Sequence, residues 1–152
     1  NSRGHLTTLI IDYYKGRLFM GVNGGYDFVD VRDVANGIIS CIDNGRKGEC
    51  YILSNQYYSV REVLDMFHHI TGKEPVNFYL PLGIAKATAP LAELYYKMLK
   101  QPPLFTPYSL FVLSSNANFS HEKATRELGY ITRPFEETGR DSVEWLKQIK
   151  RI

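Results

Sequence analysis

One stretch of this 152-residue chain, Gly24–Ser40, constrains the fold more than any other. Its two glycines predict a turn, residues 26–31 alternate as a strand does, and the period then lengthens to that of a helix. Asp30 and Asp33 stand at the start of this helix, where a carboxylate can accept free backbone N–H groups and complement the helix dipole. Asn44-Gly45 predicts its end, with the glycine left-handed. The residues that we expect on its buried face are Val34, Ala35, Ile38, Ile39 and Ile42.

A second strand and a capped helix follow this unit. Residues 48–54 indicate a strand, and residues 51–54 are apolar enough to require neighbours on both sides. Ser59 and Glu62 give the capping-box pattern of a helix that ends at Gly72. Its expected buried stripe is Val60, Val63, Leu64, Phe67 and Ile70. Elsewhere the pattern predicts strands over 18–20 and 76–80 and helices over 5–16, 83–100 and 120–128, with a last helix after Pro134.

Five motifs occur in a fixed order along the chain. They are Phe-Val-Asp-Val-Arg-Asp-Val-Ala (28–35), Gly-Glu-Cys-Tyr-Ile-Leu-Ser (48–54), Tyr-Ser-Val-Arg-Glu-Val (58–63), Ser-His-Glu-Lys-Ala-Thr-Arg-Glu-Leu-Gly-Tyr (120–130) and Ser-Val-Glu-Trp-Leu (142–146). Together they resemble the C-terminal half of the extended short-chain dehydrogenase/reductase superfamily, which includes NAD(P)-dependent epimerases, dehydratases and dihydroflavonol-reductase-like enzymes. The resemblance implies an α/β fold class. Residues 1–152 would be the helix-rich, substrate-binding C-terminal portion of a Rossmann-type protein, with few short strands.

The resemblance also implies how the chemistry is divided. In the superfamily the front half binds NAD or NADP and carries the tyrosine and lysine that transfer the proton. The resemblance therefore implies that the parent enzyme binds the cofactor and that these residues contain no catalytic or cofactor-binding group. This half would hold a small-molecule substrate at the nicotinamide. The positions that match the family's substrate-facing segments are His5, Leu6, Phe19, Met20, Tyr26 and Phe28.

Two short patterns imitate sites without the context that a site needs. The glycines of residues 21–25 are followed by a strand instead of a helix, so no helix N-terminus would face a phosphate, and we interpret them as a turn. Tyr96 and Lys100 have the spacing of the superfamily's catalytic pair. They lie far downstream of where the family keeps that pair, and we interpret the spacing as a coincidence.

One departure from the family bears on the substrate. Sugar-nucleotide epimerases of the superfamily usually carry an arginine that grips the diphosphate where this chain has Tyr26, and a second one in a segment where this chain has no arginine between Arg61 and Arg126. Arginine is the preferred bidentate phosphate partner, so we expect a reductase-like protein with a less charged substrate. Part of a nucleoside-diphosphate-sugar epimerase or dehydratase is the alternative. A non-catalytic cofactor-sensing or interaction protein is a further alternative.

Composition limits the partners and the compartment. The net charge is +2 with basic residues scattered, which argues against nucleic acid, and no apolar run is long enough to cross a membrane. Cys41 and Cys50 lack metal-ligand spacing, and we expect them to be reduced and packed in a cytoplasmic protein without a metal. The segment 51–54 would leave an unpaired sheet edge, which predicts a possible homo-oligomer.

Overall fold

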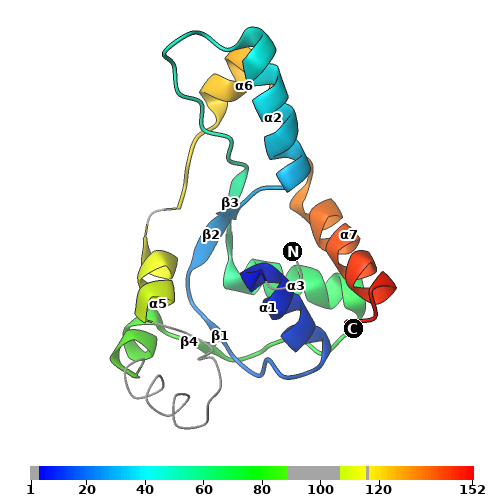
Figure 1. The fold of residues 1–152 in the computed structure, drawn as a ribbon. Coiled ribbons are helices and arrows are strands. Elements are labelled where there is room, and N and C mark those ends of the chain that lie inside the picture. Colours follow the sequence, from blue (N-terminus) through cyan, green and yellow to red (C-terminus); the bar gives the residue numbers. More distant parts are fainter. Residues whose placement is uncertain (1–3, 89–106, 116) are drawn as a thin grey trace.

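The structure is a computed structural model that describes residues 4–88, 107–115 and 117–152. Helices α1, α3 and α7 gather in a body, and helices α2 and α6 form an arm that projects from it (Figure 1). In chain order the elements are α1 (His5–Tyr14), β1 (Gly21–Val22), β2 (Gly25–Phe28), α2 (Val31–Asn44), β3 (Gln56–Ser59), α3 (Val60–Thr71), β4 (Tyr79–Leu80), α5 (Pro107–Ser114), α6 (Glu122–Leu128) and α7 (Phe135–Gln148). Residues 82–88 are also helical.

The described strands form two short ladders instead of one sheet. β1 pairs with β4 in parallel, with Gly21 opposite Tyr79. β2 pairs with β3 in antiparallel register, from Gly25 opposite Ser59 to Phe28 opposite Gln56. Gly25 is required at this crossing, because a Cβ there would collide with the carbonyl oxygen of Tyr58. The chain therefore has the few short strands that the sequence predicts.

The main core lies between α1, α3 and α7. Phe67 of α3 is completely buried there, and its ring centroid lies 6.4 Å from that of Tyr13 in α1. Gly139 lets α7 approach α3 closely, because a Cβ at this position would come within 2.7 Å of the Met66 methyl carbon. The buried members of this core are Ile10, Tyr13, Leu18, Val63, Leu64, Phe67, Val76, Tyr79, Phe135, Val143 and Leu146.

Helix α3 follows the sequence closely. Ser59 accepts a hydrogen bond from the backbone N–H of Glu62, and the Glu62 carboxylate accepts one from the backbone N–H of Ser59, so the predicted capping box is present. Gly72 ends the helix in the left-handed conformation, with φ +65°. Val63, Leu64 and Phe67 are buried as predicted, while Val60 and Ile70 are partly buried against the same core. The prediction for this helix is confirmed.

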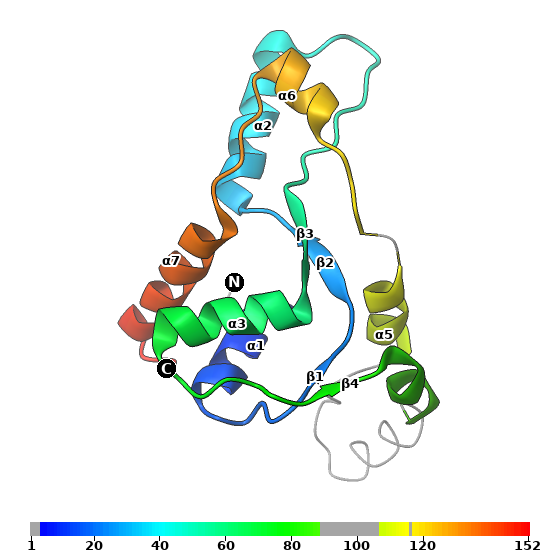
Figure 2. The ribbon, with the colours of Figure 1, turned by 180° about the vertical axis from the view of Figure 1, so that it is seen from behind.

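The arm is built differently from the body. α2 and α6 lie side by side (Figure 2), and a small cluster of Ala124, Leu128 and Tyr130 joins them with Cys41, Tyr51 and Leu53. The residues that α2 buries are Asp33 and Gly37. Leu53 and Tyr130 pack against Gly37 so closely that a Cβ there would not fit. The expected buried stripe is wrong: Ile38, Ile39 and Ile42 are exposed, as is Ala35, and Val34 is only partly covered.

The structure corrects several other expectations. Residues 18–20 precede β1 without forming a strand, residues 49–54 are not a strand, and only the end of 76–80 forms β4. A strand needs a hydrogen-bonded neighbour, and β2 pairs with residues 56–59 instead of with the predicted strand over 48–54. Gly45 follows α2 with φ −68°, so the left-handed end predicted there is wrong. Cys50 is exposed, against the expectation of two packed cysteines.

A part of the remaining predictions lies outside the described residues. The predicted helix over 83–100 is seen over residues 82–88, and the pair Tyr96 and Lys100 falls beyond the described ranges. Near the C-terminus, α6 ends at Gly129 with φ +66°, and α7 begins directly after Pro134, as predicted. In α7, Phe135, Val143 and Leu146 are buried, whereas Trp145 of the same expected core is exposed, as is Ile149 directly after the helix.

Candidate functional site

The six residues predicted to face a substrate lie on three successive segments. His5 and Leu6 begin α1, Phe19 and Met20 lie just before β1, and Tyr26 and Phe28 are on β2. Leu6 and Phe28 are partly buried against the main core. Phe19 is 71% exposed, and Met20 is partly exposed. The structure thus brings Leu6 and Phe28 to one cluster, and leaves Phe19 on the surface; the substrate role of all six stays a prediction.

A column of aromatic rings joins β2 and β3 to α7. The Phe28 ring stacks on that of Phe135 with 5.0 Å between centroids, and the Tyr58 ring stacks on the same phenylalanine at 4.8 Å. Tyr26 completes the column through an edge contact with Phe28 at 5.9 Å. Sequence reasoning missed Tyr58 and Phe135 as neighbours of the predicted residues. For Tyr58, the signal that could have found it is the strand register, because Tyr58 lies opposite Tyr26 once β2 and β3 are paired.

Tyr26 lies in an apolar environment. Its side chain is partly buried against a second cluster that consists of Val22, Ala85, Leu110 and Leu113. Burial raises the pKa of the Tyr26 hydroxyl above its usual value, so the side chain is neutral at physiological pH. Tyr26 therefore presents an uncharged ring beside aliphatic side chains.

Asp30 is the most heavily hydrogen-bonded carboxylate at the base of the arm. It accepts bonds from the Arg32 backbone N–H at 2.8 Å, from Arg32 Nη2 at 2.7 Å and from the Thr138 hydroxyl at 2.7 Å. The Arg32 side chain, which donates to the carboxylate, holds the pKa of Asp30 well below its usual range. Arg32 also pairs with Asp141 at 2.7 Å, so this network ties the start of α2 to α7.

Asp33 makes a second tie between distant parts of the chain. Its carboxylate accepts from the Arg133 backbone N–H at 2.9 Å and from Arg133 Nε at 2.9 Å, and Arg133 Nη2 lies 2.8 Å from Oδ1. Because Asp33 is buried, losing one of these contacts would leave a polar group with no hydrogen-bond partner, since water cannot replace it there. All of these bonds are made within the chain, and we therefore interpret Asp30 and Asp33 as positioning the arm.

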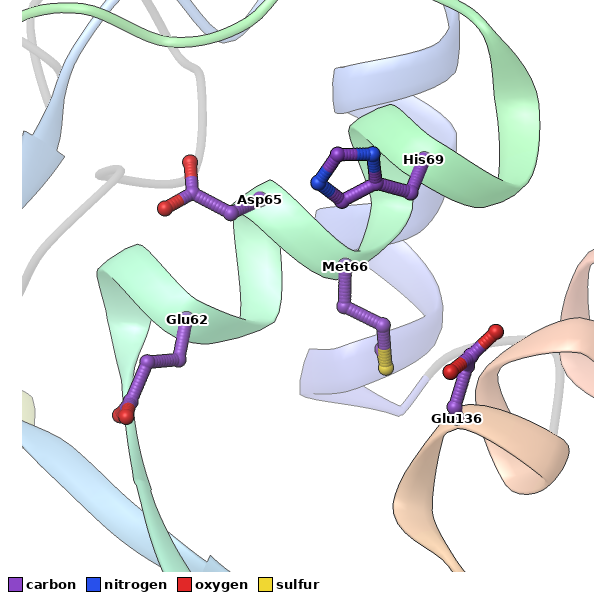
Figure 3. A pocket seen from close by; sticks show the side chains of 5 residues that line it. All are labelled: Glu62, Asp65, Met66, His69 and Glu136. Carbon is purple, nitrogen blue, oxygen red and sulfur yellow. The ribbon is translucent and has the colours of Figure 1, made fainter.

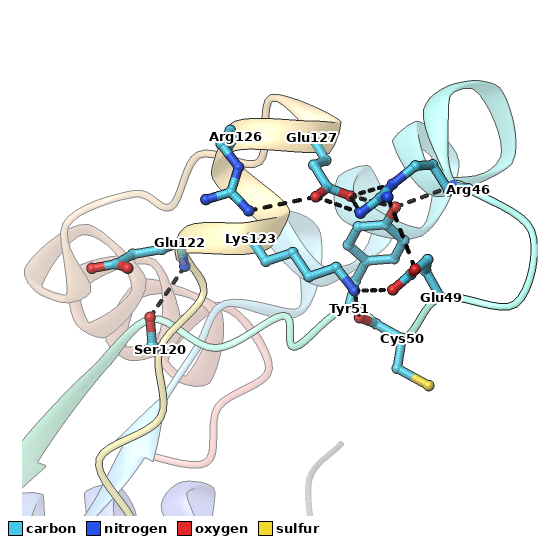
Figure 4. A network of polar contacts seen from close by, with 9 residues as sticks. All are labelled: Arg46, Glu49, Cys50, Tyr51, Ser120, Glu122, Lys123, Arg126 and Glu127. Carbon is cyan, nitrogen blue, oxygen red and sulfur yellow. Dashed lines mark hydrogen bonds and ion pairs between the residues drawn. The ribbon is translucent and has the colours of Figure 1, made fainter.

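The tip of the arm is closed by a surface network (Figure 4). Arg46 Nη2 lies 2.8 Å from Glu127 Oε1, the Tyr51 hydroxyl donates to the same carboxylate at 2.9 Å, and Lys123 pairs with Glu49 at 2.7 Å. The bond from Arg46 lowers the pKa of Glu127 below its usual value. These contacts join α6 to the loop after α2. Because the network is exposed, we expect it to contribute little to stability.

An open groove lies on the surface between α3 and α7 (Figure 3). Asp65, Met66 and His69 line it from α3, Glu136 faces them from α7, and Glu62 stands at one end. Glu62 is already engaged by Ser59, whose bond lowers the pKa of the carboxyl group. Among the described residues, no group of three histidine, cysteine or acidic side chains is arranged to hold a metal ion.

The glycine-rich turn does not fit a dinucleotide. Gly24 has φ +139°, and a Cβ there would come within 2.8 Å of the Leu113 carbonyl oxygen. Gly25, the first residue of β2, packs still more closely on the Tyr58 carbonyl oxygen. These glycines therefore serve contacts within the chain, and no helix N-terminus follows them to receive a phosphate. In the part of the chain that is described, no helix is both long and apolar enough to cross a membrane.

Comparisons with known proteins give relatives that are much longer than this chain. No family model matches it. It is 27% identical over 143 residues to sterol demethylase protein B of Methylococcus capsulatus, a match that covers 91% of this chain and 43% of that protein. It is also 27% identical over 141 residues to a ketoreductase of Stigmatella aurantiaca that acts on 4-hydroxy-2-methyl-3-oxo-4-farnesyl-3,4-dihydroquinoline-1-oxide, covering 88% of this chain and 42% of that protein. The chain thus spans less than half the length of these relatives.

Solved structures agree with the sequence matches. The crystal structure of gox2253 superposes with a TM-score of 0.77 at 28% identity, over 95% of this chain and 44% of that one. A nucleoside-diphosphate-sugar epimerase from Pseudomonas aeruginosa superposes with a TM-score of 0.73 at 19% identity, over 95% of this chain and 43% of that one. The second likeness shows the fold alone. In sequence and in fold, the chain is similar to the C-terminal portion of extended short-chain dehydrogenases/reductases.

Proposed function

We propose that residues 1–152 supply substrate recognition to an NAD(P)-dependent oxidoreductase of the reductase type. The reaction would transfer hydride at a carbon that bears a hydroxyl or carbonyl group. A separate nucleotide-binding portion would carry NAD or NADP and the proton-transfer residues, and this chain would hold a small-molecule substrate against the nicotinamide. The relatives support an oxidoreductase or epimerase family. The choice of a reductase depends on this chain's own residues.

Tyr26 is the observation that carries this choice. A diphosphate needs a guanidinium or another cation, and Tyr26 offers a neutral hydroxyl beside Val22, Leu110 and Leu113. An arginine placed there would have to be desolvated among aliphatic side chains, which is costly without a carboxylate partner. An uncharged, largely apolar substrate suits the position better. The likeness to a ketoreductase supports the same choice.

Part of a nucleoside-diphosphate-sugar epimerase or dehydratase is the second candidate. The observation that favours it is the superposition on the Pseudomonas aeruginosa epimerase. In this alternative, a lysine would have to replace arginine as a point charge at the phosphates. The second candidate requires a charged nucleoside-diphosphate sugar as substrate, whereas the first requires an uncharged ketone. The substrate that the assembled protein converts therefore distinguishes the two candidates.

The experiment pairs this chain with the amino-terminal portion of Methylococcus capsulatus sterol demethylase protein B, up to the start of the matched region. Oxidation of NADH and NADPH is followed with a panel of steroidal and aromatic ketones, and epimerisation is followed with UDP-glucose and UDP-glucuronic acid. Ketone-dependent oxidation is the expected result. Epimerisation of a UDP-sugar without ketone reduction would establish the second candidate. Cofactor binding with neither reaction would overturn both and leave a non-catalytic sensor.

Two substitutions at one position sharpen this test. Tyr26→Phe keeps the ring and its aliphatic contacts, so we expect kcat/KM for the ketone close to that of the unchanged chain. Tyr26→Arg introduces a cation beside Val22 and Leu110 and should lower kcat/KM for the ketone. If Tyr26→Arg left ketone reduction unaltered, Tyr26 would have no part in substrate selection.

A further inference from the structure

The dipeptide Asn-Gly occurs three times in this chain, each time in a different backbone environment. Asn23-Gly24 lies in the turn between β1 and β2, Asn36-Gly37 lies inside α2, and Asn44-Gly45 lies at the end of α2. All three asparagines are exposed. An asparagine that precedes glycine is prone to lose its side-chain amide, because glycine has no side chain to hinder attack by its backbone nitrogen.

Deamidation needs only the two residues and water. The backbone nitrogen of the glycine attacks the asparagine Cγ, and the side-chain nitrogen leaves as ammonia with the proton of that N–H. Water then opens the cyclic imide at one of its two carbonyl groups, which gives aspartate or isoaspartate. An N–H that is bonded to a carbonyl must first break that bond, so a hydrogen bond at the glycine slows the reaction.

The three glycine N–H groups differ in their hydrogen bonding. Gly37 is an interior residue of α2, so its N–H belongs to the hydrogen-bond ladder of the helix. The Gly45 N–H donates to the Cys41 carbonyl oxygen at 2.9 Å. In the part of the chain that the structure describes, no backbone carbonyl accepts a hydrogen bond from the Gly24 N–H. The attacking group is therefore available in only one of the three dipeptides.

We propose that Asn23 is a site of spontaneous deamidation in the folded chain. Asn36 and Asn44 are protected from the same reaction by the hydrogen bonds of α2 and its end. Because solvent exposure is common to all three asparagines, the state of the glycine N–H sets the order of their reactions. The modification site lies directly before β2, the strand that carries Tyr26 and Phe28.

Two backbone hydrogen bonds bracket the modified link. The Asn23 N–H donates to the Leu80 carbonyl oxygen at 3.1 Å, and the Gly24 carbonyl oxygen accepts from the Val60 N–H at 2.8 Å. Isoaspartate places one additional main-chain carbon between these two groups. Both bonds cannot then keep their geometry, so formation of isoaspartate should displace the start of β2 and destabilise the chain. Aspartate adds a negative charge but leaves the main chain unaltered.

Peptide mapping of the aged chain tests the order of reaction. The folded chain is aged in mildly alkaline buffer made with heavy-oxygen water, so that only conversion before the digest carries the label. Asn23 should convert about 2–10-fold faster than Asn44, a factor that corresponds to the net free energy of one hydrogen bond. Asn36 should be slowest, because the interior of a helix must open first. Ageing in concentrated urea is the control, and there the three rates should be similar.

The Asn23→Gln variant shows that the label belongs to residue 23. Its longer side chain closes the cyclic imide much more slowly, so labelling there should disappear while the rates at Asn36 and Asn44 stay the same. No conversion of Asn23 in the folded chain, or conversion of Asn44 at an equal or higher rate, would overturn the proposal.

A thermal melt tests the effect on β2. The isoaspartate form, separated by chromatography, should have a lower thermal midpoint than the Asn23→Asp variant, which carries the same charge without the additional carbon. Equal midpoints for these two forms would contradict the displacement of β2.

Discussion

Helices α2 and α3 have similar sequence patterns and opposite environments. Each begins at a side-chain cap, Asp30 or Ser59, and each ends before a glycine. Each also carries an apolar stripe at helical spacing. In α3 that stripe contacts α1 and α7, and Phe67 is completely buried. In α2 the stripe faces outward, and the chain packs instead against Asp33 and Gly37.

The difference shows what an amphipathic pattern can and cannot specify. Periodicity identifies the apolar side of a helix, but the covering element comes from elsewhere in the fold. For α3 that element lies in the same chain. For α2 the chain supplies contacts only on the other side, through Leu53 and Tyr130 at Gly37 and through Arg133 at Asp33. The stability of the isolated chain should therefore respond to substitutions in α3 and to the polar base of α2, and hardly at all to the stripe of α2.

The largest effect should come from Phe67→Ala in α3. Removing a fully buried phenylalanine loses its transfer free energy and leaves a cavity, so the free energy of unfolding should fall by about 3–5 kcal/mol in urea titrations. Phe111→Ala on α5 is the matched control, because the same change at an exposed site should cost less than about 1 kcal/mol. Equal losses for the two variants would mean that α3 is not packed as described.

Asp33→Ala should be next in size. The substitution removes the carboxylate that Arg133 contacts, and it leaves a guanidinium that is only about one-fifth exposed without that partner. We expect the free energy of unfolding to fall by about 2–3 kcal/mol, less than for a fully buried pair. Asp33→Asn retains one acceptor and should lose less. If Asp33→Ala cost no more than a surface substitution, the pair would not anchor α2.

Lowering the pH should reduce the stability of the chain mainly through Asp30, at the start of α2. The bond from Arg32 makes the pKa of Asp30 lower in the folded chain than in the unfolded chain, so the unfolded state binds the proton more readily. The contribution of Asp30 to stability is thus complete above about pH 4–5 and is lost as pH falls through the folded pKa. The thermal midpoint should decline in that acid range, and Asp30→Asn should flatten the decline. Glu62 of α3 also has a lowered pKa but is exposed, so Glu62→Gln should flatten it less. An equal effect of the two variants would contradict this ordering.

The smallest effect should come from Ile42→Ala. Since Ile42 is 79% exposed, its truncation should change the free energy of unfolding of the isolated chain by no more than about 0.5 kcal/mol. The measurement is the same urea titration, with Leu64→Ala in the buried stripe of α3 as the contrast. A loss above 1.5 kcal/mol for Ile42→Ala would show that the stripe of α2 is covered within the chain, and the comparison between the helices would fail.

The sequence predicts local structure where the local signals and their partners lie in the same segment. The caps at Asp30 and Ser59 are such cases, because the donor and acceptor are two or three residues apart. The strand predicted over 48–54 is wrong because pairing is not a local property: β2 pairs with residues 56–59 instead. The contact of Tyr58 and Phe28 with Phe135 could not be foreseen, since it needs the position of α7 relative to β2 and β3.

The anchor between α2 and α7 also orders events during synthesis. Asp30 precedes Thr138 by 108 residues, and Asp33 precedes Arg133 by 100. At ordinary translation rates of about 5–20 residues per second, the two carboxylates leave the ribosome about 5–20 s before their partners. Throughout that interval the nascent α2 has neither its clamp nor a cover for its isoleucines. The arm can be completed only after Arg133 and Thr138 have been synthesised, and until then the exposed isoleucines of α2 are available for nonspecific apolar contacts.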